Sequence, residues 1–157
     1  MELRNDGCVF ITHNIASPLA RGIRNNNPLN IVRSRSQWVG KISYSMSSDS
    51  VFEQFTSIDY GVRAALILLK NYITKNKLAS VRSIITKWCP PSDKRNNTEI
   101  YIQHVENGFI RCHLNPYFFK PTALVLAHLF VYMAQIECSV TFYFSYVYRI
   151  LREYKIV

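Results

Sequence analysis

The chain has 157 residues, of which 48% are hydrophobic and 18% charged, a composition that excludes a disordered protein and fits one globular domain. Its formal net charge of +9 favours an anionic partner, such as nucleic acid, a membrane surface or an acidic cell-wall polymer, without choosing among them. The 4 cysteines show no CxxC spacing, and Cys112-His113 with the nearby His104 matches no zinc pattern, so we expect a reduced cytosolic setting with no metal and no cofactor.

The N-terminal residues 1–20 are weakly patterned, and we predict an arm with a short strand around Val9-Phe10-Ile11. Charges of both signs near Met1 interrupt any apolar run of signal-peptide length, so the protein is expected to be cytoplasmic when made. If it acts outside the cytoplasm, another factor must carry or release it.

An asparagine-rich stretch follows at residues 21–31 and is predicted to be a compact polar loop outside the core. Asparagine side chains compete for backbone hydrogen bonds, and Pro28 biases Asn27 away from the helical region. Carboxamides both donate and accept hydrogen bonds, and the indole face of Trp38 can stack on a sugar ring. The stretch therefore favours a neutral, hydroxylated ligand such as a polysaccharide.

Periodicity predicts the next elements. Between Trp38 and Phe55, polar residues alternate with apolar ones across a Ser-Ser-Asp-Ser turn, which predicts a β-hairpin. Apolar residues at helical spacing then predict three helices. These helices are expected from Ser57 or Asp59 to about Asn76, from Ser80 to Pro90, and from Asn97 or Thr98 to Gly108.

Beyond Pro116 the sequence is strongly apolar and aromatic, and we predict two buried helices at 121–136 and 140–152. A membrane-associated hairpin over 121–151 is the alternative. The uncharged run from Pro121 to Ile136 is shorter than the roughly 20 apolar residues of a spanning helix, and Glu137 would lie within the bilayer. No stable membrane span is therefore expected.

Six ordered motifs lie within residues 21–108: Arg21-Gly22-Ile23-Arg24-Asn25-Asn26-Asn27-Pro28, Trp38-x-Gly40, Phe52-x-x-Phe55, Tyr60-Gly61-Val62-Arg63-Ala64, Trp88-Cys89-Pro90-Pro91 and Asn97-Thr98-x-x-Tyr101-Ile102. Together they resemble the lysozyme-like structural or lysis proteins of phages and prophages. That family shares a wider likeness with glucosaminidases and lytic transglycosylases. One departure is Leu29, which stands where the family has glycine, so a distorted turn after Pro28 is expected.

The resemblance implies a lysozyme-like fold of the α+β class, predominantly helical with one small β-hairpin. In this organisation residues 1–20 form the arm, residues 21–115 form the lysozyme-like core, and the aromatic helices of residues 116–157 complete it. By analogy with the transglycosylases, Tyr101 would lie beside the catalytic glutamate.

Glycosidic cleavage needs a carboxylic acid that is protonated near neutral pH, and a hydrophobic environment raises the pKa of such a group. Glu137 is the only acid inside the aromatic C-terminal block, and its surroundings resemble a transglycosylase helix end with Cys138-Ser139 in place of Ser-Gly. The catalytic helix would then have moved to the C-terminus. The alternative is a buried Glu137 paired with Arg149, Arg152 or His128.

Glu53 is the rival acid because the predicted hairpin would border the same cleft, although alternation makes it a solvated strand residue by default. Glu2 lies upstream of the asparagine loop, where the enzymes carry their glutamate, but it has no helix to hold it. Asp59, Asp93 and Glu99 have structural explanations as a cap, a loop residue and a first-turn residue. Substrate contacts are expected from Asn25, Asn26, Asn30, Trp38, Arg24 and Thr98, with self-satisfied turns and a core tryptophan as the alternative.

These features predict a peptidoglycan-degrading enzyme that cleaves the glycan-strand β-1,4 bond with a single general acid, Glu137 or Glu53, assisted by Tyr101. A non-catalytic glycan-binding or virion structural module of phage origin is the alternative, so enzymatic activity stays an open question. The expected partners are peptidoglycan glycan strands, with other phage structural proteins as further candidates; nucleic acid is not expected because no known binding motif is visible. The protein would meet the cell wall after phage-type release or as part of a virion.

Overall fold

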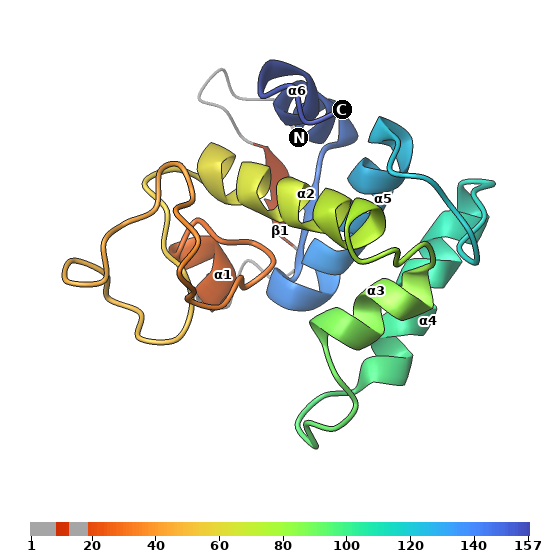
Figure 1. Ribbon diagram of the computed structural model, residues 1–157, viewed down its shortest axis with the longest axis horizontal. Coiled ribbons are helices and arrows are strands. Elements are labelled where there is room, and N and C mark those ends of the chain that lie inside the picture. The colour runs from red at the N-terminus through yellow and green to blue at the C-terminus, as the bar shows by residue number, and fades with distance from the viewer. Residues whose placement is uncertain (1–8, 13–18) are drawn as a thin grey trace.

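The computed structural model describes residues 9–12 and 19–157 and is mostly helical (Figure 1). Within those ranges it has six helices and a small two-stranded antiparallel sheet. Glu2, Cys8 and most of the predicted arm lie outside the described residues. In chain order the elements are β1 (Phe10–Thr12), α1 (Arg21–Arg24), α2 (Ile58–Thr74), α3 (Val81–Trp88), α4 (Thr98–Arg111), α5 (Ala123–Cys138), β2 (Val140–Phe142) and α6 (Phe144–Glu153).

Helix α2 crosses the middle of the molecule, with α6 on one side, α3 and α4 on the other, and the asparagine loop near its N-terminal end (Figure 1). On its predicted apolar face Leu66 and Leu69 are fully buried, whereas Tyr72 is half-buried. Ser57 precedes the helix in an extended conformation but makes no side-chain cap. The alternative cap, Asp59, is wrong: it lies in the first turn and accepts a 2.6 Å hydrogen bond from the Tyr146 hydroxyl.

Helices α3 and α4 begin where the sequence predicted. Ser80 forms a capping box with Ser83, and the Asn97 side chain accepts a hydrogen bond from the backbone N–H of Ile100. The predicted end of α4 at Gly108 is wrong, because the helix continues to Arg111. A Cβ at Gly108 would lie 2.6 Å from the Tyr132 ring, so this glycine allows α4 to approach α5 closely.

Helix α5 is the most buried element, and its residues from Val125 to Ala134 all lie in the core. Among the described residues, no helix combines the length and the apolar character that crossing a bilayer requires. The predicted helix at 140–152 is wrong at its start. Ser139 adopts a left-handed conformation with φ of 57°, and the next residues form strand β2 before α6 begins.

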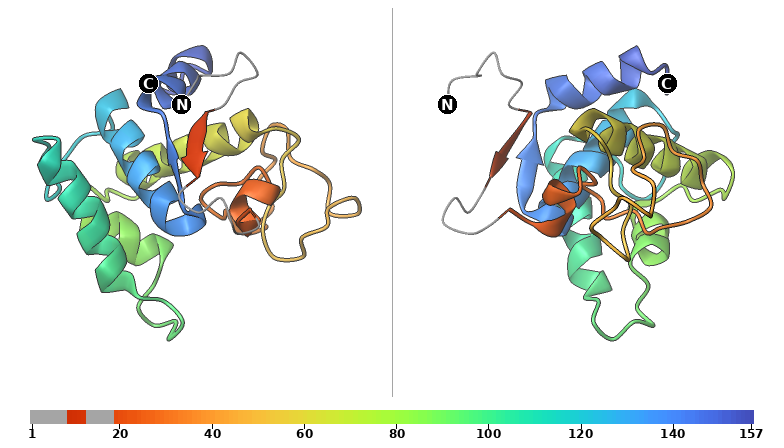
Figure 2. Two further views of the ribbon diagram at one scale, coloured as in Figure 1. Left: turned by 180° about the vertical axis from the view of Figure 1, so that it is seen from behind. Right: turned by 90° about the vertical axis from the view of Figure 1, so that its left-hand side faces the viewer.

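The predicted hairpin between Trp38 and Phe55 is also wrong. The described part of this segment holds no regular strand, only the isolated bridges Val32 with Phe52 and Lys41 with Phe55. The sheet forms elsewhere, where β1 pairs with β2 from the other end of the chain, as Figure 2 shows. Side-chain amides from the asparagine loop satisfy backbone groups of the 49–55 segment, and these contacts hold it in place of a strand ladder.

Candidate active site

Glu137 lies in the last turn of α5, where its half-buried carboxyl meets side chains from two distant parts of the chain. The Asn30 amide donates to Oε2 at 2.9 Å, and the Tyr101 hydroxyl donates to Oε1 at 3.2 Å. Asn30 also reaches the Glu137 backbone carbonyl at 3.3 Å. A loop, α4 and α5 therefore converge on one carboxyl group.

The partners of Glu137 among the described residues are neutral, so the predicted alternative of an ion pair is wrong. Arg149 pairs with Asp59 and Glu153, and the His128 ring contacts the Leu124 carbonyl. Arg152 lines a pocket with Ala123, at the opposite end of α5 from Glu137. The sequence could not choose between these outcomes because it does not show which end of α5 each arginine approaches.

Burial raises the pKa of Glu137 above its ordinary value, and hydrogen bonds from Asn30, Tyr101 and Trp88 oppose part of this effect. Burial, followed by the charge of Glu137, raises the pKa of Tyr101 well above its ordinary value. Tyr101 therefore remains a hydroxyl donor at any physiological pH. The arrangement holds a carboxyl group that gains a proton more readily than an exposed glutamate does.

An aromatic pocket of about 340 Å³ adjoins this carboxyl. Asn30 and Trp88 line the pocket and also contact Glu137, which places the carboxyl at its edge. The Tyr72 and Trp88 rings meet edge to face at 5.7 Å. The buried Trp38 Nε1 has no hydrogen-bond partner among the described residues. The other lining residues are Ile31, Val32, Ser34, Ser36 and Leu68.

The asparagine loop is part of the core, which corrects the prediction of a loop outside it. Leu29 is fully buried and Ile31 nearly so. Asn27 is also fully buried, and its side chain bonds both the N–H and the carbonyl of Ile31 and the carbonyl of Glu53. The expected distortion at Leu29 is absent, since the positive φ values of this turn fall on Asn26 and Asn30. The Asn27 side-chain amide thus links the 27–31 turn to the backbone at Glu53, where a regular strand pair would use backbone hydrogen bonds.

Gly61 sets how closely this loop approaches α2. A Cβ at that position would lie 1.7 Å from the Asn26 carbonyl oxygen, which leaves no room for any side chain. The Asn26 amide in turn donates to the Phe55 carbonyl at 3.0 Å. Asn26, a predicted sugar contact, is therefore committed to holding the loop against the helix.

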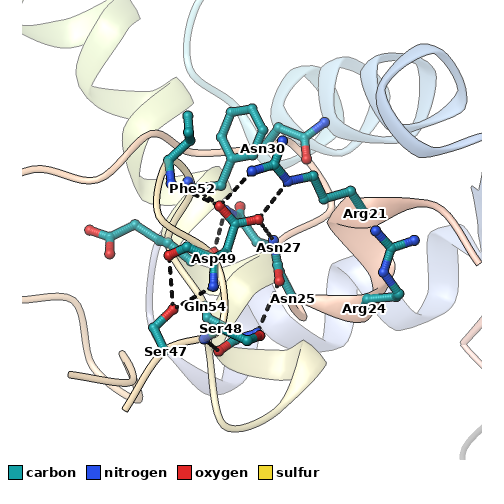
Figure 3. Close-up of polar contacts among 12 residues, drawn as sticks. Arg21, Arg24, Asn25, Asn27, Asn30, Ser47, Ser48, Asp49, Phe52 and Gln54 are labelled. Carbon is teal, nitrogen blue, oxygen red and sulfur yellow. Dashed lines mark hydrogen bonds and ion pairs between the residues drawn. The ribbon is translucent and has the colours of Figure 1, made fainter. Parts of the chain in front are cut away.

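Asn25 is committed as well, to a polar cluster around Asp49 (Figure 3). It donates to Asp49 at 2.8 Å and accepts from Gln54 at 3.0 Å. Arg21 donates twice to the same carboxylate, at 2.6 and 2.8 Å, and these bonds hold the pKa of Asp49 well below its ordinary range. The groups of this cluster satisfy one another, so it fixes the 47–54 segment in place.

The remaining predicted contacts also lie away from the pocket lining. The Arg24 guanidinium donates to the Leu19 carbonyl, and the Thr98 hydroxyl donates to the Cys89 carbonyl at 2.7 Å. Of the predicted substrate residues, Asn30 and Trp38 line the pocket. Tyr72 and Trp88 also line the pocket. Neither was predicted as a substrate contact, although Trp88 belongs to the Trp-Cys-Pro-Pro motif.

Glu53, the rival acid, is fully buried rather than solvated, which corrects the prediction from alternation. Its Oε2 lies 3.1 Å from the Lys41 ammonium and accepts a bond of the same length from the Tyr44 hydroxyl. Its Oε1 has no hydrogen-bond partner within the described ranges. Burial lowers the pKa of Lys41, but hydrogen bonds to Tyr44 and Glu53 outweigh this and leave the pKa above its ordinary value. Glu53 therefore faces a permanent cation.

Among residues 9–12 and 19–157, no group of three or more His, Cys, Asp or Glu side chains could hold a metal ion. No protein-family model matches the chain. A stretch of 91 residues is 41% identical to Protein P5 of Pseudoalteromonas phage PM2 and covers 56% of this chain. The match covers 54% of Protein P5, so the chain spans about half the length of this relative. The chain is therefore homologous to a phage protein.

Proposed function

We propose that the chain is a lysozyme-like enzyme that cleaves the β-1,4 glycosidic bond of peptidoglycan strands, with Glu137 as the general acid. The observation that carries the proposal is a desolvated carboxyl group, held by neutral donors, at the edge of an aromatic pocket. Relatedness to a phage protein supports it, because phages must breach the bacterial cell wall. The enzyme would meet the wall after release or within a virion.

In this mechanism the protonated Glu137 donates its proton to the leaving glycosidic oxygen as the C1–O bond breaks. The C1 atom then forms a new bond to the sugar's own 6-hydroxyl, which gives a 1,6-anhydro end, or to water, which gives a reducing end. The Glu137 carboxylate takes up the proton that the attacking hydroxyl or water loses. Burial favours the protonated form beforehand, and the donors Asn30 and Tyr101 then stabilise the carboxylate that the transfer produces. The hydrogen bonds also fix the direction of the carboxyl group. We assign Tyr101 and Asn30 to positioning the acid.

The pocket supplies the features that bind a hexose. Trp38, Tyr72 and Trp88 present apolar ring surface that can pack on the C–H faces of sugars, and Ser34 and Ser36 offer hydroxyl groups. Asn25, Asn26 and Thr98 act indirectly in this proposal, because none of them lines the pocket. Asn25 bonds the Asp49 carboxylate, and Asn26 and Thr98 bond the backbone carbonyls of Phe55 and Cys89.

A non-catalytic glycan-binding module is the second candidate, and one observation favours it. Every hydrogen bond that Glu137 accepts from Asn30, Tyr101 and Trp88 favours the ionised carboxyl group. If these bonds outweigh burial when a glycan is bound, Glu137 would serve as a fixed acceptor for sugar hydroxyls.

Purified peptidoglycan sacculi distinguish the two candidates. We expect the wild-type chain to release soluble fragments and the Glu137→Gln variant to release none, while Glu53→Gln stays active if it folds. If the wild-type protein binds sacculi over a range of pH but releases no fragments, the enzymatic proposal is wrong and the non-catalytic binding module is the better explanation. Mass spectra of the fragments then separate 1,6-anhydro ends, formed by a transglycosylase, from reducing ends, formed by a hydrolase.

A further inference from the structure

A basic surface that also exposes aromatic side chains lies at the end of the molecule where α2, α4 and α6 terminate and α5 begins. Figure 1 shows the ends of α2 and α4 and the start of α5 on the right, with the C-terminus next to α5. We call this surface the basic end. It consists of the exposed cations Lys75, Lys77, Arg111, Lys120, Arg152 and Lys155 and the exposed apolar residues Tyr117, Phe118 and Leu124.

Backbone contacts bring these separate segments together. The Phe119 N–H donates to the Ala79 carbonyl at 2.9 Å, and the Val81 N–H donates to the Pro116 carbonyl at 2.9 Å. The loop between α4 and α5 is therefore fixed against the turn that carries Lys75 and Lys77. A pocket of about 450 Å³ joins the start of α5 to the C-terminal segment, and its lining includes Ala123, Tyr148, Arg152 and Lys155.

The apolar side chains of the basic end are exposed to solvent and do not pack in the core. Tyr117 is 67% exposed and Phe118 is 66% exposed, whereas the next residue, Phe119, is buried against Phe109. Leu124 is 45% exposed in the first turn of α5. Because Phe119 anchors the loop on both its ring and its backbone, the two preceding rings are held outward in a fixed position.

The cations of the basic end are uncompensated. None of them takes part in an ion pair within the part of the chain that the structure describes. The nearest acid along α6, Glu153, pairs with Arg149. Lys77 and Lys155 also occupy left-handed backbone positions after α2 and α6, where glycine would be unstrained. Lysine therefore stands at two positions of the basic end where the backbone conformation alone favours glycine.

We propose that the basic end docks on the surface of an anionic phospholipid bilayer. Lysine and arginine attract acidic headgroups, while exposed aromatic and aliphatic side chains between them enter the headgroup region. A nucleic acid would use the cations but would gain little from Phe118 and Leu124. The basic end is separate from the pocket beside Glu137, so this proposal does not depend on the glycosidase activity.

Vesicle co-sedimentation of the full chain tests the proposal. We expect binding to vesicles of phosphatidylcholine with phosphatidylglycerol, little binding to phosphatidylcholine alone, and loss of binding at high salt. Replacing Lys77, Lys120 and Lys155 by glutamine should weaken binding by about fivefold for each lysine removed. The double variant Tyr117→Ser, Phe118→Ser should weaken it further at fixed charge.

Matched controls come from the loop between α3 and α4 and the start of α4. Lys94 and Ile100 are similarly exposed, and Lys94→Gln and Ile100→Ser should leave vesicle binding unchanged. Circular dichroism of each variant confirms that it is folded. The proposal is wrong if the wild-type protein does not co-sediment with anionic vesicles. Equal loss of binding in the control variants also overturns it, as does binding to duplex DNA at least as tight as to vesicles and insensitive to the Tyr117 and Phe118 changes.

Discussion

Glu53 is fully buried and Glu137 is half-buried, and their surroundings differ in one decisive respect. Glu53 has the Lys41 ammonium at 3.1 Å, a full positive charge that accompanies it into the core. Within residues 9–12 and 19–157, Glu137 meets neutral donors, namely Asn30, Tyr101 and Trp88. Both carboxyl groups have fixed partners, but Glu53 is paired with a cation whereas Glu137 accepts hydrogen bonds from neutral groups.

This difference determines what each acid can do. A carboxylate beside a cation is stabilised in its charged form, and removing either partner leaves an unpaired charge. A carboxyl group surrounded by dipoles in a desolvated site can change its protonation state at moderate cost. Burial alone therefore does not identify a catalytic acid; burial without a counter-ion is the more informative feature.

The largest expected effect is on turnover. Glu137→Gln keeps the side-chain shape but cannot donate the proton, so kcat on purified peptidoglycan should fall by about 10² to 10⁴. Measured release of soluble fragments, with circular dichroism to confirm folding, gives the result. If Glu137→Gln keeps a kcat near the wild-type value, the distinction drawn between Glu137 and Glu53 is wrong, because the general acid must then be another residue.

Removing the counter-ion should expose the structural role of Glu53. Lys41→Met leaves the buried Glu53 carboxylate without its cation and should lower the free energy of unfolding by about 3 kcal/mol or more. Urea denaturation measures the change. The double variant Lys41→Met, Glu53→Gln is the control and should recover much of the loss; a double variant that is no more stable than Lys41→Met would show that the charge was not responsible.

A smaller effect concerns pH. Tyr101→Phe removes a hydrogen bond that lowers the pKa of Glu137, so the pKa should rise. Because the active form is protonated, the alkaline limb of kcat/KM should move to higher pH, by up to about one unit. An alkaline limb that moves to lower pH in Tyr101→Phe would contradict the assignment of Glu137 as the general acid. The same limb persisting in Glu137→Gln would also contradict it, because another group would then be titrating.

The smallest effect is at the helix end that positions Glu137. Ser139 has φ of 57°, a conformation that glycine adopts without strain, and glycine is what the transglycosylase-like pattern has here. Ser139→Gly should therefore raise the unfolding free energy by up to about 1 kcal/mol and leave kcat unchanged. Thermal denaturation measures the gain, and a clear loss of stability would show that the Ser139 side chain contributes more than its backbone strain.

Local sequence patterns predicted the helices well, because apolar spacing reports burial directly. Apolar periodicity placed α2, and capping residues placed the starts of α3 and α4. The failures involve contacts between distant residues. Gly108 looked like a helix end because the ring of Tyr132, which needs that glycine, is far away in sequence. Strand β2 looked helical because its partner β1 lies near the other end of the chain.

The candidate site was only partly visible for the same reason. The sequence singled out Glu137 as the acid in the aromatic block, Tyr101 by resemblance and Asn30 as a sugar contact. Their mutual contacts depend on how α4, α5 and the loop pack. Alternation assigned Glu53 to solvent because it carries no information about Lys41. Asn25 and Asn26 looked like free amides because a single sequence does not reveal which backbone groups need partners.

The pairing of β1 with β2 has a mechanical consequence for the helix end that carries Glu137. Thr12 is in register with Val140, and the Phe10 and Phe142 rings lie 5.3 Å apart, so the strand near the N-terminus clamps the chain a few residues beyond the carboxyl group. Weakening this clamp, for example through Phe10→Ala, would therefore loosen the chain next to the carboxyl group without changing any residue of the pocket lining.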